Sequence, residues 1–399
     1  MTGRPAGWHL DINSAYPWAV SLLPSMQRGE WVEGPGGPVA AGTSHPLGAL
    51  RGLTPRPDFA LFSIRWDLQP RTAPFFPFAY RDSSGAIFYP PVGRAVVWAP
   101  ELVAALRGMA GPHPLWRGVL EVERWVAWKP EEDLRPFAFL RGIYDHRASV
   151  KDKDPGLAMV DKLAMNSVYG KLCQQVGGTS TKLPPWFQMA WAGWVTAAIR
   201  ARLLRMALLD PLAVVAFMTD GLFIRRLPRT RGRERFGFGL GEWSAEPVEE
   251  LVSVNSGVYF ETVRGEVISH FRGFDPPGRS PDGEKEGLSR ELVLQGYAAG
   301  APFVEAPSTR FVQMGRALQE DWSLYCQWLT IPRKCDLRSS PGGAKRYLPT
   351  RRGDPGRGLQ RTLATPVYEA RFLPSSPYPL LWGRSAESLL VEEWEDSFL

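Results

Sequence analysis

Apolar and polar residues alternate at the start of the chain, in the stretch WHLDINSAYPWA. Trp8, Leu10 and Ile12 fall on one face of an extended chain, and this alternation predicts a strand. Asp11 stands where the strand should end, and Pro17 limits backbone hydrogen bonding beyond it. A carboxylate at a strand end is either a solvated residue or a functional one, and the pattern alone leaves both interpretations open.

Apolar runs of two kinds predict the next elements. Residues 59–68, 86–99 and 118–128 are rich in aromatic and β-branched residues and predict strands. Residues 100–109 begin with proline and continue with helix formers, which predicts a helix. Residues 33–57 are rich in glycine and proline and predict a flexible connection.

Three helices are predicted in the middle of the chain. The first spans about 135–151 and the second about 157–174, and the short polar turn between them makes them an antiparallel pair. The third, at 186–210, is apolar over much of its circumference, so we expect it to lie behind a sheet.

A strand, a tight turn and a second strand are predicted at 213–227. The turn at Thr219–Gly221 places Asp220 at the tip of this hairpin. The remainder of the chain, 240–399, mixes strands and helices with many turns. Its acidic and apolar end, 387–399, predicts either a packed terminal helix or a detachable peptide that binds a partner.

Length and composition narrow the class of protein. The 399 residues suit two or three packed subdomains or one large irregular domain. No apolar run approaches the roughly 20 residues of a membrane helix, and the start, MTGRPAGWHL, is too short and polar for a signal peptide, so a cytoplasmic protein is expected. The cysteines, Cys173, Cys326 and Cys335, form no CxxC pair, which argues against a zinc knuckle or a disulfide framework.

The formal net charge is +6, and two stretches concentrate the positive charge. They are residues 225–236, which begin with Arg225 and Arg226, and residues 333–361, which include Lys345 and Arg346. Both stretches contain glycine and proline and read as loops. They are either solvated surface loops or a surface that binds the phosphates of nucleic acid.

Asp11 and Asp220 are the two candidate catalytic carboxylates. Carboxylates on neighbouring strand ends can hold two divalent metal ions roughly 3.5–4 Å apart, the arrangement used for phosphoryl or nucleotidyl transfer. On the second predicted helix, Lys162, Asn166 and Tyr169 share one face.

Arg147 and Lys151 are also four residues apart, on the first helix of the pair. If both helices present these side chains to one side, they form a clamp for a polyanion such as a triphosphate. The alternative is that these cations lie on solvated helix surfaces.

Three short motifs in this order resemble those of family B DNA polymerases. DINSAYP (11–17) is similar to motif A, KLAMNSVYG (162–170) to motif B and FMTDGLF (217–223) to motif C. Arg147 and Lys151 have the spacing of the family's triphosphate-binding pair. The resemblance covers about residues 8–275 and is to the viral, plasmid and protein-primed branch.

The resemblance implies an α+β fold of the right-hand polymerase type, with an antiparallel-sheet palm, short two-helix fingers and a thumb. It divides the chain into a palm at 1–134 with an inserted subdomain at about 33–115, fingers at 135–175, a second palm part at 176–275, and a thumb and C-terminal tail at 276–399. The activity it implies is template-directed 5′–3′ DNA synthesis. In that reaction, nucleotidyl transfer from a dNTP to a primer 3′-OH uses two Mg²⁺ or Mn²⁺ ions.

The resemblance also assigns roles to residues. Asp11, Asp220 and the carbonyl of Ile12 correspond to metal ligands, and Tyr16 to the steric gate below the sugar. The residues implied in nucleotide binding are Tyr16, Arg147, Lys151, Lys162, Asn166 and Tyr169. Those implied in DNA binding, together with the basic stretches, are Gly170, Thr219, Arg225, Arg226, Tyr259, Arg272, Gly273, Lys345 and Arg346.

Four positions depart from the family's motifs. Met218 stands in place of the first carboxylate of motif C, and Gly221 in place of its serine. Ala15 replaces a leucine beside Tyr16, which predicts a looser steric gate. Gly257 stands where a primer-contacting lysine is usual.

Only ten residues precede motif A, so we expect no proofreading exonuclease domain. Two other functions stay open. The missing exonuclease and Ala15 favour a primase-polymerase or translesion polymerase, whereas Met218 and Gly257 favour a catalytically weak accessory subunit that binds nucleic acid.

The expected partner is primer-template DNA, with a priming protein, a primase or a separate exonuclease as further partner classes. We expect a monomer without membrane contact, in the cytoplasm of a bacterial or archaeal host, with a phage or plasmid as a candidate source of the gene.

Overall fold

The structure is a computed structural model that describes most of the chain in two compact units. The described residues are 6–39, 54–73, 75–81, 87–110, 114–174, 183–230, 234–255, 258–271, 273–275, 287–312, 314–319, 321–337, 346–349, 370–373 and 380–383. The larger unit comprises His9–Ala245 and Arg346–Arg371, and the smaller unit comprises Met1–Trp8, Glu246–Lys345 and Phe372–Leu399. The chain is a mixed α/β protein with antiparallel sheets.

One four-stranded sheet places the strand that carries Asp11 beside the hairpin that carries Asp220. Its strand order is β10-β1-β9-β8, formed by β1 (Gly7–Ile12), β8 (Val214–Phe217), β9 (Gly221–Ile224) and β10 (Trp243–Val248). Strand β1 buries Leu10 and Ile12 and leaves Asp11 half-buried, as the alternation predicts. Strands β8 and β9 form the predicted antiparallel hairpin, which follows a short 3-10 helix at Pro211–Ala213.

Strand β1 ends at Ile12, one residue after Asp11, as its pattern predicts. Helix α1 (Ala15–Ser21) follows β1 after a turn in which Ser14 adopts a left-handed conformation with φ 48°. Pro17 lies in the first turn of α1, where a helix does not need the backbone N–H that proline lacks. Only Asn13 and Ser14 therefore separate the end of β1 from the start of α1.

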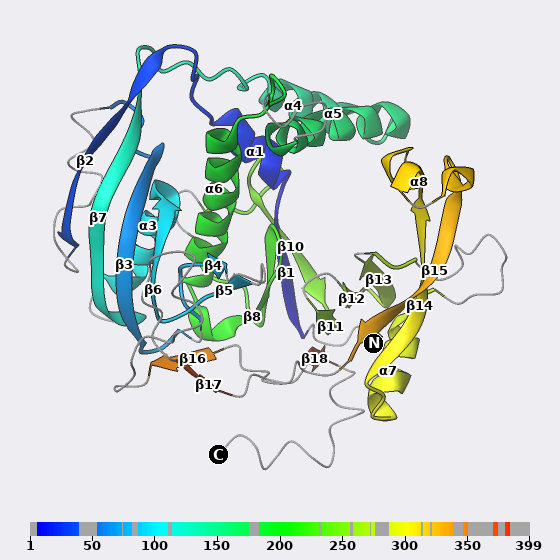
Figure 1. Cartoon of the computed structure of the whole chain (residues 1–399). Helices are drawn as coiled ribbons and strands as arrows, with labels where there is room; N and C mark the ends of the chain where they lie inside the picture. The colour runs from blue at the N-terminus through cyan, green and yellow to red at the C-terminus, as the bar shows by residue number, and fades with distance from the viewer. Residues whose placement is uncertain are drawn as a thin grey trace. The chain divides into compact units, whose positions relative to one another are not determined.

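A second four-stranded antiparallel sheet has the order β2-β7-β3-β6 (Figure 1). Its strands are β2 (Gly29–Val39), β3 (Ala60–Pro70), β6 (Val92–Trp98) and β7 (Trp116–Pro130). Helix α3 (Ala99–Met109) packs on one face, where Phe62, Ile64 and Trp66 of β3 are buried. A short strand pair, β4 (Tyr80–Arg81) and β5 (Ile87–Phe88), accompanies it.

Strand β2 contradicts the prediction of a flexible connection from residue 33 onward. Its residues 33–39, EGPGGPV, pair with β7 despite their glycines and prolines. An edge strand tolerates proline because one side of its backbone has no ladder to complete. Gly34 and Gly36 are needed for packing, since a Cβ on them would overlap the Trp125 ring and the Val122 backbone respectively.

Three long helices complete the larger unit. They are α4 (Leu140–Val150), α5 (Pro155–Cys173) and α6 (Met189–Ala207). Helices α4 and α5 form the predicted pair, but α4 begins at Leu140 rather than near residue 135. Helix α5 begins two residues early, because Asp154 caps it by accepting a hydrogen bond from the Leu157 N–H at 2.9 Å. Helix α6 is largely buried and contacts α1, α3 and β6.

The smaller unit contains its own sheet, hairpin and core. The sheet has the order β13-β12-β11-β18, from β11 (Glu250–Asn255), β12 (Val258–Val263), β13 (Glu266–Phe271) and β18 (Leu380–Gly383). The hairpin joins β14 (Phe303–Phe311) and β15 (Trp328–Asp336). The helices are α7 (Arg290–Ala298), α8 (Met314–Gln319) and a 3-10 turn at Trp322–Leu324. The core includes Val252, Phe260, Val293 and Val304.

A further two-stranded sheet pairs β16 (Arg346–Pro349) with β17 (Ala370–Leu373). Among the described residues, no helix is both long enough and apolar enough to cross a membrane.

Candidate active site

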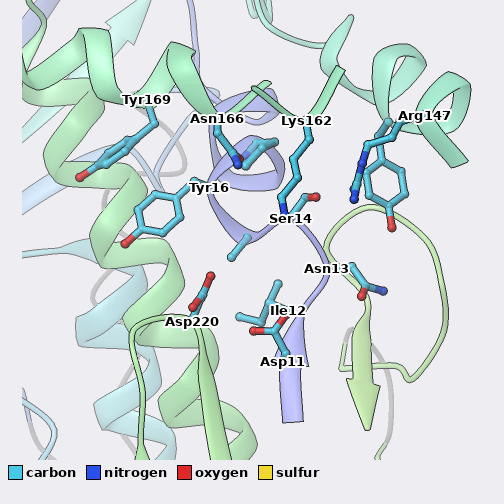
Figure 2. Close-up of a pocket in the computed structure, with 13 residues that line it drawn as sticks. Asp11, Ile12, Asn13, Ser14, Tyr16, Arg147, Lys162, Asn166, Tyr169 and Asp220 are labelled. Carbon is cyan, nitrogen blue, oxygen red and sulfur yellow. The ribbon is translucent and has the colours of Figure 1, made fainter. Parts of the chain in front are cut away.

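A pocket in the larger unit gathers most of the residues that the sequence singles out. Its volume is about 480 Å³, within the range of small-molecule sites. It is lined from β1, α1, α4, α5 and the β8–β9 turn (Figure 2). The lining residues are Asp11, Ile12, Asn13, Ser14, Ala15, Tyr16, Pro17, Tyr144, Arg147, Lys162, Asn166, Tyr169 and Asp220.

Asp11 and Asp220 lie at one end of this pocket, Asp11 on β1 and Asp220 in the β8–β9 turn (Figure 2). The Ile12 N–H donates to the Asp220 carbonyl at 3.2 Å, which ties the hairpin turn to the end of β1. The Ser244 hydroxyl donates to the Asp11 carbonyl at 3.3 Å. The structure thus brings together the two carboxylates, 209 positions apart in the chain, that the sequence proposes as a pair.

Burial raises the pKa of Asp220. The charge of His9 and a backbone hydrogen bond act to lower this pKa, but they offset only part of the rise. The His9 ring stacks on Phe223 with the ring centroids 4.4 Å apart. His9 was not identified from the sequence. Its position two residues before Asp11 on a strand, hence on the same face, is the signal that would have indicated it.

Gly221 allows the hairpin to approach β1 closely. A Cβ at this position would lie 2.6 Å from the Leu10 carbonyl oxygen and 3.4 Å from an Asp11 carboxylate oxygen. A side chain here would displace the backbone of β1. The glycine that departs from the motif is therefore a packing requirement of this particular sheet.

The side chains of Arg147, Lys162 and Asn166 reach the pocket from α4 and α5 (Figure 2). The Nε of Arg147 is buried and has no hydrogen-bond partner among the described residues. A buried donor without a partner costs free energy that an anionic ligand would recover. Lys151, at the end of α4, is exposed and does not line this pocket.

Tyr16 and Tyr169 form the wall of the pocket on the side away from Arg147 (Figure 2). The rings of Tyr16 and Tyr169 pack with centroids 4.6 Å apart. Burial raises the pKa of Tyr169, and a hydrogen bond with Cys173 adds to this, so the phenol stays protonated at neutral pH. Ala15, the departure beside Tyr16, is buried at the start of α1.

Arg200 of α6 lies near these phenols and was not identified from the sequence. Its Nε donates to Glu101 at 2.8 Å, and its charge acts to lower the pKa of Tyr169. The sequence carried no local signal for this residue, because α6 reads there as a buried apolar helix.

A loop at residues 237–242 is attached to the pocket through Asn13 and Tyr144. The Asn13 side chain donates to the Gly237 carbonyl at 2.8 Å, and the Asn13 N–H donates to the Glu242 carbonyl at 2.9 Å. The Tyr144 hydroxyl donates to the Phe238 carbonyl at 2.7 Å. Neither Asn13 nor Tyr144 was identified from the sequence, although Tyr144 is three residues before Arg147 on one helix face.

The residues predicted to bind DNA in the larger unit lie outside the pocket lining. Gly170 on α5 is exposed, with no atom within 4 Å of where its Cβ would stand. Thr219 is exposed in the hairpin turn, and Arg225 and Arg226 are exposed after β9. Arg226 forms an ion pair with Asp210.

Two predicted DNA-binding residues lie in the smaller unit. Tyr259 stacks on His270 with ring centroids 4.2 Å apart. Gly273 has φ 84°, and its carbonyl accepts from Arg333 at 3.1 Å. Arg272, Lys345 and Gly257 lie outside the described residues. Arg346 begins β16, but its side chain is outside the description as well.

Comparison with known proteins finds similarity only among solved structures. No family model matches the chain, and no curated protein matches its sequence. The chain is similar to Phi29 DNA polymerase in an orthorhombic crystal form, with TM-score 0.49, 13% identity, and coverage of 83% of this chain and 58% of that chain.

Two complexes of the same polymerase are also similar. The one with primer-template DNA and incoming nucleotide substrates has TM-score 0.47, 13% identity, and coverage of 83% of this chain and 57% of that chain. The one with single-stranded DNA has TM-score 0.43, 15% identity, and coverage of 77% and 55%. The chain spans less than two thirds of the length of these structures.

Proposed function

We propose that this chain is a template-directed DNA polymerase of the family B type, which transfers a nucleotide from a dNTP to a primer 3′-OH. The observation that carries the proposal is the pocket itself. It has two carboxylates at one end, cations from two helices, and two tyrosines whose rings pack against each other on the remaining wall. A deoxynucleoside triphosphate has a complementary layout of phosphates, sugar and base.

The residues fit a pair of Mg²⁺ or Mn²⁺ ions that are held partly by substrate. Among the described residues, no group of three or more His, Cys, Asp or Glu side chains is placed to hold a metal. Mg²⁺ commonly binds through one or two carboxylates together with substrate phosphates. Asp11, Asp220 and the Ile12 carbonyl would hold the ions, whose chemistry is to activate the attacking oxygen and stabilise the leaving oxygen.

Arg147 and Lys162 would neutralise the triphosphate and the charge that develops on the leaving pyrophosphate. Phosphoryl transfer needs little covalent chemistry from the protein, so positioning of the substrates and stabilisation of charge supply most of the catalysis. The Nε of Arg147 is a buried donor without a hydrogen-bond partner among the described residues, and a phosphate oxygen would supply one. Asn166 would donate to a phosphate or to the sugar.

Tyr16 would lie under the deoxyribose and exclude a 2′-hydroxyl, and Tyr169 would stack at the nascent base pair. The contact between their rings limits how far the Tyr16 ring can move. In this assignment the sheet of β1, β8, β9 and β10 is the palm, α4 and α5 are the fingers, and residues after 275 form a thumb. The partner is primer-template DNA.

Primer extension by the purified protein tests the proposal. Wild type is expected to extend a labelled primer in the presence of dNTPs and Mg²⁺, and Asp11→Ala and Asp220→Ala are expected to give no product above background. Glu30→Ala is the matched control, because Glu30 is an exposed carboxylate of β2 that pairs with Lys129 at 3.1 Å. An Asp220→Ala variant as active as wild type would sink the assignment.

The same assay separates the polymerase from its nearest alternative. Strict dependence on a primer and on dNTPs is expected. Product with ribonucleotides, or without any primer, would instead indicate a primase-polymerase.

A further inference from the structure

Helix α4 carries Arg147 into the pocket but has little core to hold it. Of its residues Leu140–Val150, only Leu140 is buried, at the end of the helix away from Arg147. Burial of apolar side chains normally determines where a helix rests. Packing against α5 and α1 holds α4 only through half-buried side chains, so polar contacts made farther along α4 add to what positions Arg147.

One such contact joins α4 to its neighbouring helix. His146 of α4 lies 2.8 Å from the Asp161 carboxylate of α5. This contact holds the two helices to each other. It does not determine how the helix pair sits over the carboxylates of the sheet.

The Tyr144 hydroxyl makes the second contact, to the Phe238 carbonyl at 2.7 Å. Tyr144 and Arg147 are three residues apart and lie on the same side of α4. Both line the pocket. The bond connects the side of α4 that bears Arg147 directly to the 237–242 loop.

Several hydrogen bonds hold the 237–242 loop in place. Besides the Asn13 bonds, the Gly239 N–H donates to Glu242 at 2.9 Å, and the Gly241 N–H donates to the Asn13 carbonyl at 2.8 Å. Asn13 in turn stands two residues after Asp11. The chain of contacts Asp11–Asn13–loop–Tyr144–Arg147 thus relates the cation to the carboxylates.

We propose that Tyr144 is a positioning residue: its hydrogen bond to the Phe238 carbonyl holds α4 so that Arg147 faces the triphosphate of the bound nucleotide. This inference rests on the proposed function, since it takes a nucleoside triphosphate as the ligand. Removing the hydroxyl leaves the Arg147 charge in place and frees the helix that carries it.

Tyr144→Phe tests the inference, because it deletes one oxygen and keeps the ring. The KM for dNTP should rise about fivefold, the effect of losing one hydrogen bond of ordinary strength. The Kd for primer-template DNA should stay at the wild-type value, and the melting temperature should fall by no more than about 3 °C, because one exposed hydrogen bond is lost. Tyr297→Phe, in the smaller unit, is the matched control and should leave the KM unchanged.

A double variant shows whether Tyr144 acts through Arg147. If it does, adding Tyr144→Phe to Arg147→Ala should change the KM no further. Effects that multiply would mean that the phenol contacts the substrate itself, and would overturn the positioning role. An unchanged KM in Tyr144→Phe would overturn it too.

Equilibrium binding of dGTP, measured by calorimetry, separates this inference from the proposed function. If wild type extends no primer, the polymerase proposal fails. The positioning role is still supported if Tyr144→Phe weakens dGTP binding about fivefold in wild type and not at all in Arg147→Ala. Equal dGTP affinity of wild type and Tyr144→Phe would refute the positioning role.

Discussion

At the scale of single residues, the buried charge of Asp220 lowers the stability of the folded chain. Its burial raises the pKa, so the folded chain holds a proton at this carboxyl more tightly than the unfolded chain does. The group therefore favours the folded state at low pH, and this contribution is lost as the pH rises through the raised pKa. At neutral pH the ionised carboxylate disfavours folding, a cost that the metal-binding role proposed for Asp220 would explain.

Asp220→Asn should consequently raise the melting temperature at neutral pH without divalent metals, by about 2 °C or more. The amide keeps the shape of the side chain and removes the buried charge. The gain should shrink as the pH falls from the raised pKa of folded Asp220 to the pKa of an unfolded aspartate, because the wild-type carboxyl becomes protonated over this range. Differential scanning calorimetry measures both effects.

Asp210→Asn is the comparison variant for this measurement. Asp210 pairs with Arg226 at the surface, so no gain at neutral pH is expected there. A lower melting temperature for Asp220→Asn than for wild type would contradict the account of Asp220.

The residues of the site that could be predicted from the sequence are those held in short local patterns. Lys162, Asn166 and Tyr169 share a helix face by their spacing alone, and Asp11 and Asp220 stand at predicted strand ends. Arg200 enters the site only through tertiary packing of α6, and Asn13 through its bonds to the 237–242 loop. Spacing along the chain carries no information about such partners.

At the scale of elements, the approach of β9 to β1 determines how near Asp220 lies to Asp11. Gly221→Ala should destabilise the protein by about 1–3 kcal/mol, because its Cβ meets the Leu10 carbonyl and a backbone cannot move aside as a side chain can. Activity should fall as well, since any relief of the clash separates the two carboxylates. Chemical denaturation and primer extension measure the two effects.

Gly142→Ala is the matched control for this element. Gly142 lies inside α4 with no atom within 4 Å of its would-be Cβ, so alanine should be neutral or raise stability by up to about 1 kcal/mol. If Gly221→Ala proved as stable and active as Gly142→Ala, the close approach of the strands would not be a constraint.

Elements were predictable where hydrophobic periodicity was strong, as in β3, β7, α5 and α6. Strand β2 was not, because glycine and proline are turn formers on average, and only pairing at a sheet edge with β7 makes them part of a strand. Helix α1 could not be predicted from the sequence either. Its start depends on the left-handed backbone of Ser14, which no alternation of residues reveals.

At the scale of the whole molecule, the net charge of +6 strengthens DNA binding only if the positive side chains lie on the surface that contacts DNA. Each phosphate contact releases counterions, so the logarithm of the affinity falls with the logarithm of salt concentration by about 0.9 per contact. The exposed Arg225 and Arg226 are adjacent in sequence but differ electrically. Arg226 already pairs with Asp210, whereas Arg225 forms no ion pair with any residue that the structure describes.

Arg225→Ala should therefore reduce the salt slope of primer-template binding by about 0.9, and Arg226→Ala by clearly less. Asp210→Ala should steepen the slope, since it frees the Arg226 guanidinium for a phosphate. Fluorescence anisotropy with labelled duplex, from about 50 to about 200 mM salt, resolves slopes of this size. Identical slopes for wild type and Arg225→Ala would place the basic stretch after β9 away from the DNA, because a cation that contacts phosphate cannot be removed without changing the number of counterions released.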